Sequence, residues 1–125
     1  MRSSLLMAYR LQSKAAEVGF DWKDIKPVFE KVEEELSELR KSLSKGDFDR
    51  VAQELGDLLF AVINLARKMS VDPEHALRRA IERFKRRFRY IEEKLTREGR
   101  SLKEASLEKM DALWEEAKEM EMGGL

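Results

Sequence analysis

The sequence predicts an all-α protein, a four- to five-helix bundle, and three observations support this fold class. Charged residues make up 40% of the 125 residues and proline occurs only twice, a composition typical of long solvated helices. Apolar residues recur at spacings of three and four, as they do on one face of a helix. Residues that start or stop helices fall between these periodic segments. We expect a single domain covering residues 1–125.

Composition also excludes several functional classes. Lysine plus arginine and aspartate plus glutamate number 25 each, so no net field attracts the whole chain to nucleic acid or an acidic membrane. Cysteine is absent and histidine occurs once, which removes disulfides and thiolate or imidazole-rich metal sites. No apolar run approaches the roughly 20 residues that span a bilayer, and the N-terminal segment has no signal-peptide pattern. We expect a cytoplasmic protein that binds neither membranes nor nucleic acid.

Five helices can be placed from their end signals. Gly19, Gly46 and Gly99 each follow a periodic segment, and Pro27 and Pro73 suit a first helical turn because the N–H that proline lacks is unpaired there. Asp47 or Asp49, Asp72 and Ser106 are candidate N-caps. The expected helices cover about residues 4–18, 27–44, from 47 or 49 to 69, 73–99 and 106–120. The tail, about residues 121–125, is expected to fray.

Apolar residues on the fourth helix form one continuous stripe that we expect to lie in the core or in a dimer interface. The stripe comprises Leu77, Ile81, Phe84, Phe88, Ile91 and Leu95.

The second helix carries acids at the edge of its apolar face. That face is formed by Val28, Val32, Leu36, Leu39 and Leu43. At about 100° per residue, Glu33 and Glu34 point well away from it. Glu35 lies at its edge and Glu38 on the same flank, one turn further on. These two carboxylates therefore point partly toward the core.

The third helix is apolar almost all round, so we expect it to be the buried central helix. Glu54, Asp57 and Asn64, with the small Ala61 among them, line up along one side of this helix. Burying ionised carboxylates is costly unless each is paired or bound to a metal. The polar residues on this helix therefore require an explanation.

Taken alone, each acidic pair has the spacing of ordinary helix-surface charge. Together, on neighbouring antiparallel helices joined by a short turn, the two pairs predict an acidic cluster that faces across the helix pair. An all-oxygen cluster favours Mg²⁺, or Mn²⁺ as a substitute. A di-iron bundle would need Glu-x-x-His pairs, and the single histidine, His75, lies near the start of another helix.

The residues around these acids resemble a known family. Residues 31–38 read KVEEELSE and residues 54–60 read ELGDLLF. They are similar to the E-E-x-x-E and E-x-x-D motifs of MazG-type nucleoside triphosphate pyrophosphohydrolases. The resemblance extends to GFDW at residues 19–22, VINLAR at 62–67, RFKRRFR at 83–89 and MDALW at 110–114. It covers nearly the whole chain and resembles the catalytic C-terminal half of two-domain members.

The resemblance implies the conversion of nucleoside triphosphate and water to nucleoside monophosphate and pyrophosphate, as nucleotide-pool house-cleaning. Glu35, Glu38, Glu54 and Asp57 would bind Mg²⁺. One of the glutamates would instead act as the base toward the attacking water. Glu38 is the first choice for this role and Glu35 the second.

The resemblance also implies a substrate-binding set. Lys31, Arg83 and Arg87 would hold the triphosphate, and Trp114 would pack on the nucleobase. Glu34, the first acid of the E-E-x-x-E motif, would belong to this set as an outer residue, because its helical phase points outward. The family further implies a homodimer or a higher homo-oligomer.

Two alternatives remain open. A related all-α pyrophosphatase with a narrow substrate, of the dUTPase or phosphoribosyl-ATP type, would share the acidic ligands. A helical interaction module would instead use the arginines of the fourth helix as a solvated basic face that binds nucleic acid. Without the resemblance, Trp22 and Trp114 would by default be ordinary core residues.

Overall fold

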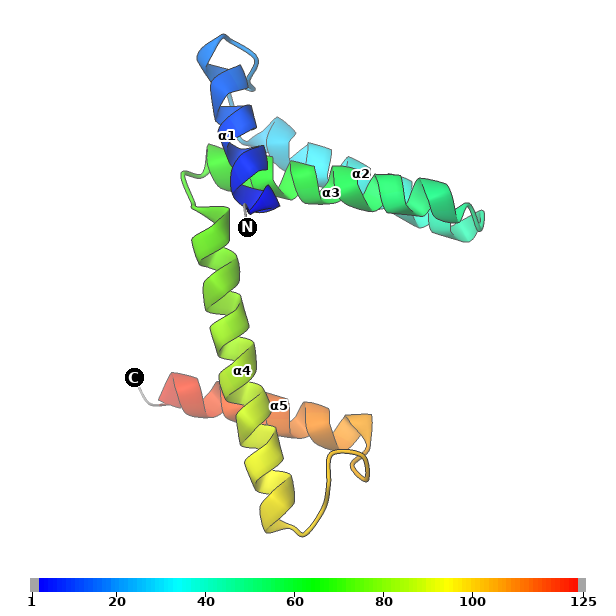
Figure 1. Ribbon diagram of the computed structural model, residues 1–125, viewed down its shortest axis with the longest axis vertical. Helices are drawn as coiled ribbons and strands as arrows, with labels where there is room; N and C mark the ends of the chain where they lie inside the picture. The colour runs from blue at the N-terminus through cyan, green and yellow to red at the C-terminus, as the bar shows by residue number, and fades with distance from the viewer. Residues whose placement is uncertain (1–2, 124–125) are drawn as a thin grey trace. The chain divides into compact units, whose positions relative to one another are not determined.

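Helices make up all the regular structure in the computed structural model, which describes residues 3–123 (Figure 1). No strand occurs in that range, so the prediction of an all-α protein is confirmed. None of its helices is long and apolar enough to cross a membrane. The helices are α1 (Ser4–Glu17), α2 (Lys26–Ser44), α3 (Phe48–Lys68), α4 (Pro73–Arg97) and α5 (Leu107–Gly123).

The helix ends follow the predicted signals closely. The Asp47 carboxylate accepts a hydrogen bond from the Arg50 backbone N–H at 3.2 Å and caps α3. The Ser106 hydroxyl does the same for the Lys109 N–H at 3.1 Å at the start of α5. Gly46 has a φ of 71°, which glycine adopts without strain, and it closes the short turn between α2 and α3.

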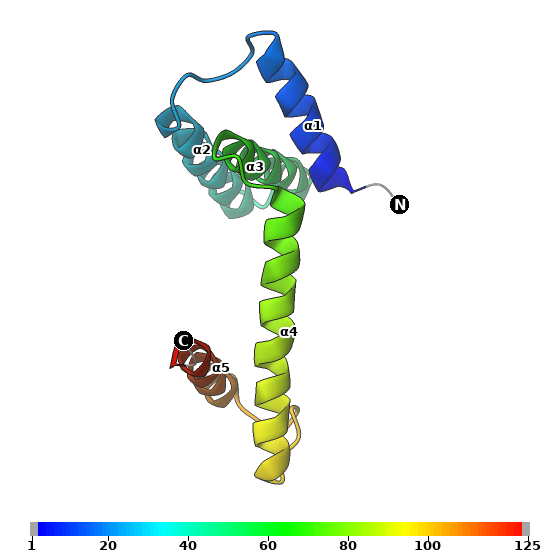
Figure 2. The ribbon, with the colours of Figure 1, turned by 90° about the vertical axis from the view of Figure 1, so that its left-hand side faces the viewer.

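The chain divides into two compact units, one ending at Ala76 and the other beginning at Leu77. A single domain over residues 1–125 therefore stays a prediction. In the first unit α2 and α3 form an antiparallel hairpin, and α1 packs against α3 (Figure 2). This hairpin places the two acidic segments of the sequence side by side.

The core of the first unit is small. Val28 from α2 and Ala61 and Ile63 from α3 are buried. Leu55, Leu59 and Val62 on α3 remain 46%, 53% and 45% exposed. The expectation that α3 is a buried central helix is therefore wrong for this face, because α1 and α2 cover only part of its circumference.

The second unit has its own core. Ile91, Leu95 and Leu113 are buried there, and Trp114 is among the partly buried side chains packed against them. Further along the predicted α4 stripe, Leu77, Ile81 and Phe84 are 46%, 47% and 56% exposed.

α5 continues through Gly123, so residues 121–123 are helical in the structure, and the fraying of this tail stays a prediction. Glu121 forms an ion pair with Arg87 at 2.9 Å, which anchors this last turn. Residues 124–125 lie outside the described part of the chain.

Candidate functional site

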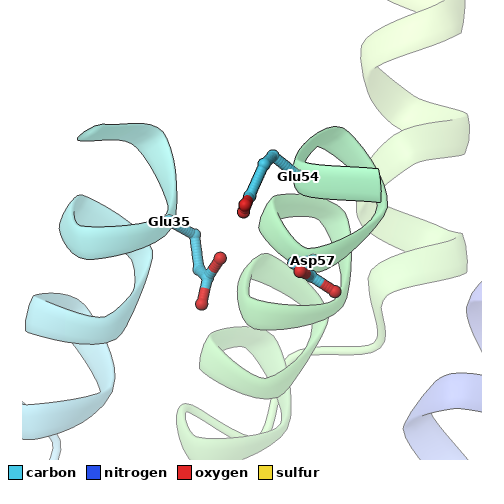
Figure 3. A group of neighbouring side chains, drawn as sticks. All are labelled: Glu35, Glu54 and Asp57. Atoms are coloured by element: carbon cyan, nitrogen blue, oxygen red, sulfur yellow. The ribbon is translucent and has the colours of Figure 1, made fainter. Parts of the chain in front are cut away.

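Three carboxylates meet across the α2–α3 hairpin. Glu35 comes from α2, and Glu54 and Asp57 come from α3, one turn apart (Figure 3). One oxygen atom from each of the three lies within 4.8 Å of the others. Three of the four acids predicted as metal ligands are thus brought together.

The three acids differ in burial and in their partners. Glu54 is only 5% exposed, and its Oε1 accepts a hydrogen bond from Arg50 Nε at 3.3 Å. The Glu35 carboxylate lies 3.1 Å from Lys31 Nζ, while Asp57 is exposed. The hydrogen bond to Glu35, helped by the negative charge of Glu34, raises the pKa of Lys31, which keeps this ammonium charged beside the acids.

Glu38 and Glu34 lie outside this group of oxygen atoms. Glu38 Oε1 is 3.5 Å from Lys41 Nζ, and its side chain is 43% exposed. The Glu34 side chain is 61% exposed and 3.7 Å from Lys31 Nζ. The exposure of Glu34 agrees with the outward orientation expected from its helical phase. The metal-binding role of Glu38 stays a prediction.

A cavity of about 540 Å³ opens next to the carboxylates. Glu35, Asp57 and Lys31 line it, and so do Phe20 and Trp22 from the segment between α1 and α2. These two aromatic side chains are 83% and 49% exposed, so their faces are available to a ligand. The remaining lining residues are Leu11, Gln12, Ala15, Gly19, Asp21, Phe60, Ala61 and Asn64.

Ionic contacts hold the segment that carries the two aromatic residues against α3. Arg67 donates hydrogen bonds from both terminal nitrogens to the Asp21 carboxylate, at 2.6 and 3.3 Å. Lys68 lies 3.4 Å from the same carboxylate and donates a hydrogen bond to the Trp22 carbonyl. The Arg67 hydrogen bond, with the positive charges of Arg67 and Lys68, holds the pKa of Asp21 below its usual range. Asp21 therefore fixes the loop while it is ionised.

The other predicted substrate-binding residues lie in the second unit. The Arg87 guanidinium is centred 5.2 Å from the Trp114 ring centroid. Arg87 Nε and a terminal nitrogen also donate to the Glu121 carboxylate. Hydrogen bonding by Arg87, together with the charges of Arg87, Arg86 and Arg83, lowers the pKa of Glu121. Arg87 thus contacts both Trp114 and Glu121, and Arg83 lies near enough to Glu121 for its charge to act on that carboxylate.

Sequence reasoning assigned no role in a site to Phe20 and Gln12, and it treated Trp22 as core. Gln12 is buried, and it lies on the same face of α1 as Leu5, Ala8 and Ala15. A polar residue on an apolar helix face is a sequence signal for a buried polar contact, and it could have identified Gln12. The signal for Phe20 is weaker, since an exposed aromatic residue in a connecting segment has no periodic pattern around it.

The donor set fits a hard divalent cation. All three grouped side chains supply carboxylate oxygens, and the described residues hold no grouped histidine that would favour zinc. The buried Glu54 is balanced within the chain by one partly exposed arginine. A bound cation would balance the remaining negative charge.

Fold and site together define an all-α protein that presents a carboxylate cluster on a helical hairpin beside an aromatic-lined cavity. A family model described as the MazG nucleotide pyrophosphohydrolase domain matches residues 23–91, which include all three grouped acids. Because this match covers more than half of the chain, the chain belongs to that family.

Two curated relatives match nearly the whole chain. The Thermotoga maritima protein named nucleoside triphosphate pyrophosphohydrolase/pyrophosphatase MazG is 47% identical over 92% of this chain and 44% of its own length. The Escherichia coli (strain K12) protein named nucleoside triphosphate pyrophosphohydrolase is 38% identical over 95% of this chain and 46% of its own length. The chain thus spans less than half the length of either relative.

Proposed function

We propose that this chain hydrolyses nucleoside triphosphates to nucleoside monophosphates and pyrophosphate, with Mg²⁺ as cofactor. The observation that carries this proposal is the group of three carboxylate oxygens within 4.8 Å beside a cavity with uncovered aromatic faces. Acids suit a cation that accompanies phosphates, and aromatic faces suit a nucleobase. The names of the two relatives support the same reaction.

Glu35, Glu54 and Asp57 would hold the cation. When bound, Mg²⁺ supplies charge neutralisation for the phosphates and lowers the pKa of a coordinated water. Glu38, one turn from Glu35 and 43% exposed, is the carboxylate we propose to accept the proton of the attacking water. Water then adds to the α-phosphorus, and the bond from that phosphorus to the pyrophosphate oxygen breaks.

Cationic side chains would bind the phosphate oxygens. Lys31 lines the cavity, and its raised pKa keeps it protonated at neutral pH. We propose that Arg83 and Arg87 also bind phosphate, because one guanidinium group can donate two parallel hydrogen bonds to two phosphate oxygens. Trp114 remains a predicted nucleobase contact, although the cavity favours Phe20 and Trp22 for that role.

The test is to titrate Mg²⁺ with each of the eight common triphosphates while pyrophosphate release is followed. We expect Asp57→Asn and Glu35→Gln to reduce Mg²⁺-dependent release by at least about a hundredfold, because each removes a charged ligand. Matched controls are Asp49→Asn on α3 and Glu33→Gln on α2, which change exposed acids outside the group. Normal hydrolysis by Asp57→Asn would refute the site assignment.

The same titration tests the range of substrates. A house-cleaning enzyme is expected to accept several triphosphates, and we propose this role for the chain. Strict use of dUTP would instead indicate a narrow pyrophosphatase of the dUTPase type.

We also propose that the chain works as a homodimer or a higher homo-oligomer. The α2–α3 hairpin leaves apolar side chains uncovered on both helices, with Leu36 and Leu43 on α2 being 40% and 60% exposed. Large uncovered apolar patches usually mark an interface. A second copy of the same hairpin would cover them.

A further inference from the structure

One side chain that lines the cavity carries a buried hydrogen-bond acceptor with no partner in the part of the chain that the structure describes. Gln12 is 8% exposed, and its Nε2 donates a hydrogen bond to the Phe60 carbonyl at 2.9 Å. Its Oε1 is buried without a hydrogen-bond partner among the described residues. A carbonyl can only accept a hydrogen bond, so the amide nitrogen must face Phe60 and the oxygen must be the atom left over.

Asn64 is oriented in the opposite sense. Its Oδ1 accepts a hydrogen bond from Arg67 Nε at 3.0 Å. A guanidinium can only donate, so the amide oxygen must face Arg67 and the Nδ2 donor is left over. Arg67 is itself held by the Asp21 carboxylate at 2.6 Å, which limits its freedom to turn away.

Two residues that line the same cavity therefore have amides fixed in opposite ways. Gln12 keeps an acceptor without a partner within the described range, and Asn64 keeps a donor. Both residues line the cavity, together with the uncovered Phe20 and Trp22. An acceptor and a donor that line the same cavity as two aromatic side chains complement the edge of a nucleobase, which carries an N–H donor next to a ring or carbonyl acceptor.

We propose that Gln12 and Asn64 bind the edge of the nucleobase in this cavity and set the rank order of affinity among the bases it accepts. Gln12 Oε1 accepts a hydrogen bond from a donor on the base edge, and Asn64 Nδ2 donates to an adjacent acceptor. This inference rests on the proposed function, which supplies the nucleotide, and it adds the residues that read the base. Among the bases that the cavity accepts, one that cannot make either hydrogen bond binds more weakly, because it leaves a buried polar group unpaired.

Binding of product monophosphates, measured by calorimetry without metal, tests the role of Gln12. Each natural monophosphate is paired with an analogue that lacks one donor: AMP with purine riboside monophosphate, GMP with IMP, CMP with zebularine monophosphate, and UMP with its N3-methyl derivative. We expect the wild type to bind the natural member of at least one pair about tenfold more tightly. Gln12→Met should bring that ratio close to one.

The control is Gln53→Met, which replaces an exposed glutamine on α3 and should leave every ratio unchanged. A Gln12→Met variant that weakens all eight ligands by the same factor would overturn the proposal, since that is the result of a structural role. Absence of monophosphate binding by the wild type would overturn it as well. Helical circular dichroism establishes that each variant is folded.

Asn64→Asp tests the second residue with little change in shape. One carboxylate oxygen can keep the Arg67 contact, while the other replaces the free donor with an acceptor. We expect the rank order of the four natural monophosphates to change. An unchanged order with a uniform loss of affinity would contradict a role in base reading.

A ribose hydroxyl could supply the same donor, so AMP and dAMP are compared as well. If Gln12→Met changes the AMP to dAMP ratio and no base-analogue ratio, Gln12 binds the sugar and the assignment to the base is wrong. Because monophosphate binding requires no hydrolysis, these results stand apart from those of the pyrophosphate assay.

Discussion

Glu54 is the least exposed of the grouped carboxylates, at 5%. A buried ionised group costs several kcal/mol unless charge or hydrogen bonds compensate it, and Arg50, with a side chain 60% exposed, compensates only in part. Asp57 and Glu35 add further negative charge within 4.8 Å. The metal-free protein should therefore be less stable than its Mg²⁺ complex.

We predict that Mg²⁺ raises the melting temperature of the wild type. At a hundredfold excess over its dissociation constant, a ligand that binds only the folded state adds about 2.7 kcal/mol. Asp57→Asn should lose most of this shift, and Asp49→Asn should keep it. Differential scanning fluorimetry with Mg²⁺ and with EDTA measures the effect without reference to activity. An equal shift in both variants would show that the cation binds elsewhere.

Asp21 should control the aromatic loop through its charge. Its lowered pKa means that the Arg67 contact contributes stability above the unfolded-state pKa, near 3.8, and that this stability is lost as the pH falls through the lowered value. We predict that Trp22 fluorescence, in a Trp114→Phe background, stays constant from neutral pH down past 3.8 and changes only in stronger acid.

In that background, Asp21→Asn should already show the altered emission at neutral pH. Asp24→Asn, an exposed acid in the same segment, is the control and should behave as the parent does. A transition of the parent above pH 5 would mean that another group holds the loop.

Helical phase predicted an acidic cluster across the hairpin, and the structure brings Glu35, Glu54 and Asp57 together because the helices pack on the faces that their apolar residues define. The fourth predicted ligand, Glu38, has its carboxylate beside Lys41 outside the group, and its role stays a prediction. The Gln12 contact joins residues 48 positions apart in the chain. No local pattern encodes such a pairing, so the polar lining of the cavity required the three-dimensional structure.

At the scale of the helices, most ends were predictable because caps and glycines act within a few residues of the chain. α5 runs past its expected end near residue 120 to Gly123, and a contact with α4 rather than a local signal holds this last turn. Arg87 holds Glu121 across 34 positions of sequence. That ion pair also occupies the guanidinium that we propose binds phosphate.

We predict that Glu121→Gln strengthens the binding of inorganic pyrophosphate by roughly two- to fivefold, the usual size for loss of a competing exposed ion pair. The phosphate no longer has to displace a carboxylate from Arg87. Glu116→Gln is the control, because Glu116 contacts Tyr90 and Lys94 instead. Isothermal titration calorimetry measures both. A weaker affinity in Glu121→Gln would mean that Glu121 orients Arg87 for the anion rather than competing with it.

At the scale of the whole molecule, the apolar pattern predicted the fold class. It did not predict what packs against each apolar helix face. The pattern marks α3 as apolar on nearly every side, and a sequence does not state whether its own chain or another copy packs there. In the structure α1 and α2 cover part of α3 and leave Leu55 and Leu59 about half exposed. That open face is the basis for the oligomer that we propose.

We predict that the wild type sediments with at least twice the mass of one chain and that Leu59→Asp sediments as a single chain. Burial of apolar surface stabilises an interface by roughly 25 cal/mol per Å², and an aspartate at its centre would be buried without a partner. Leu107→Asp is the control, because Leu107 is 74% exposed at the start of α5. Analytical ultracentrifugation over a range of concentrations measures all three proteins. A wild type of single-chain mass at every concentration would contradict the oligomer that we propose.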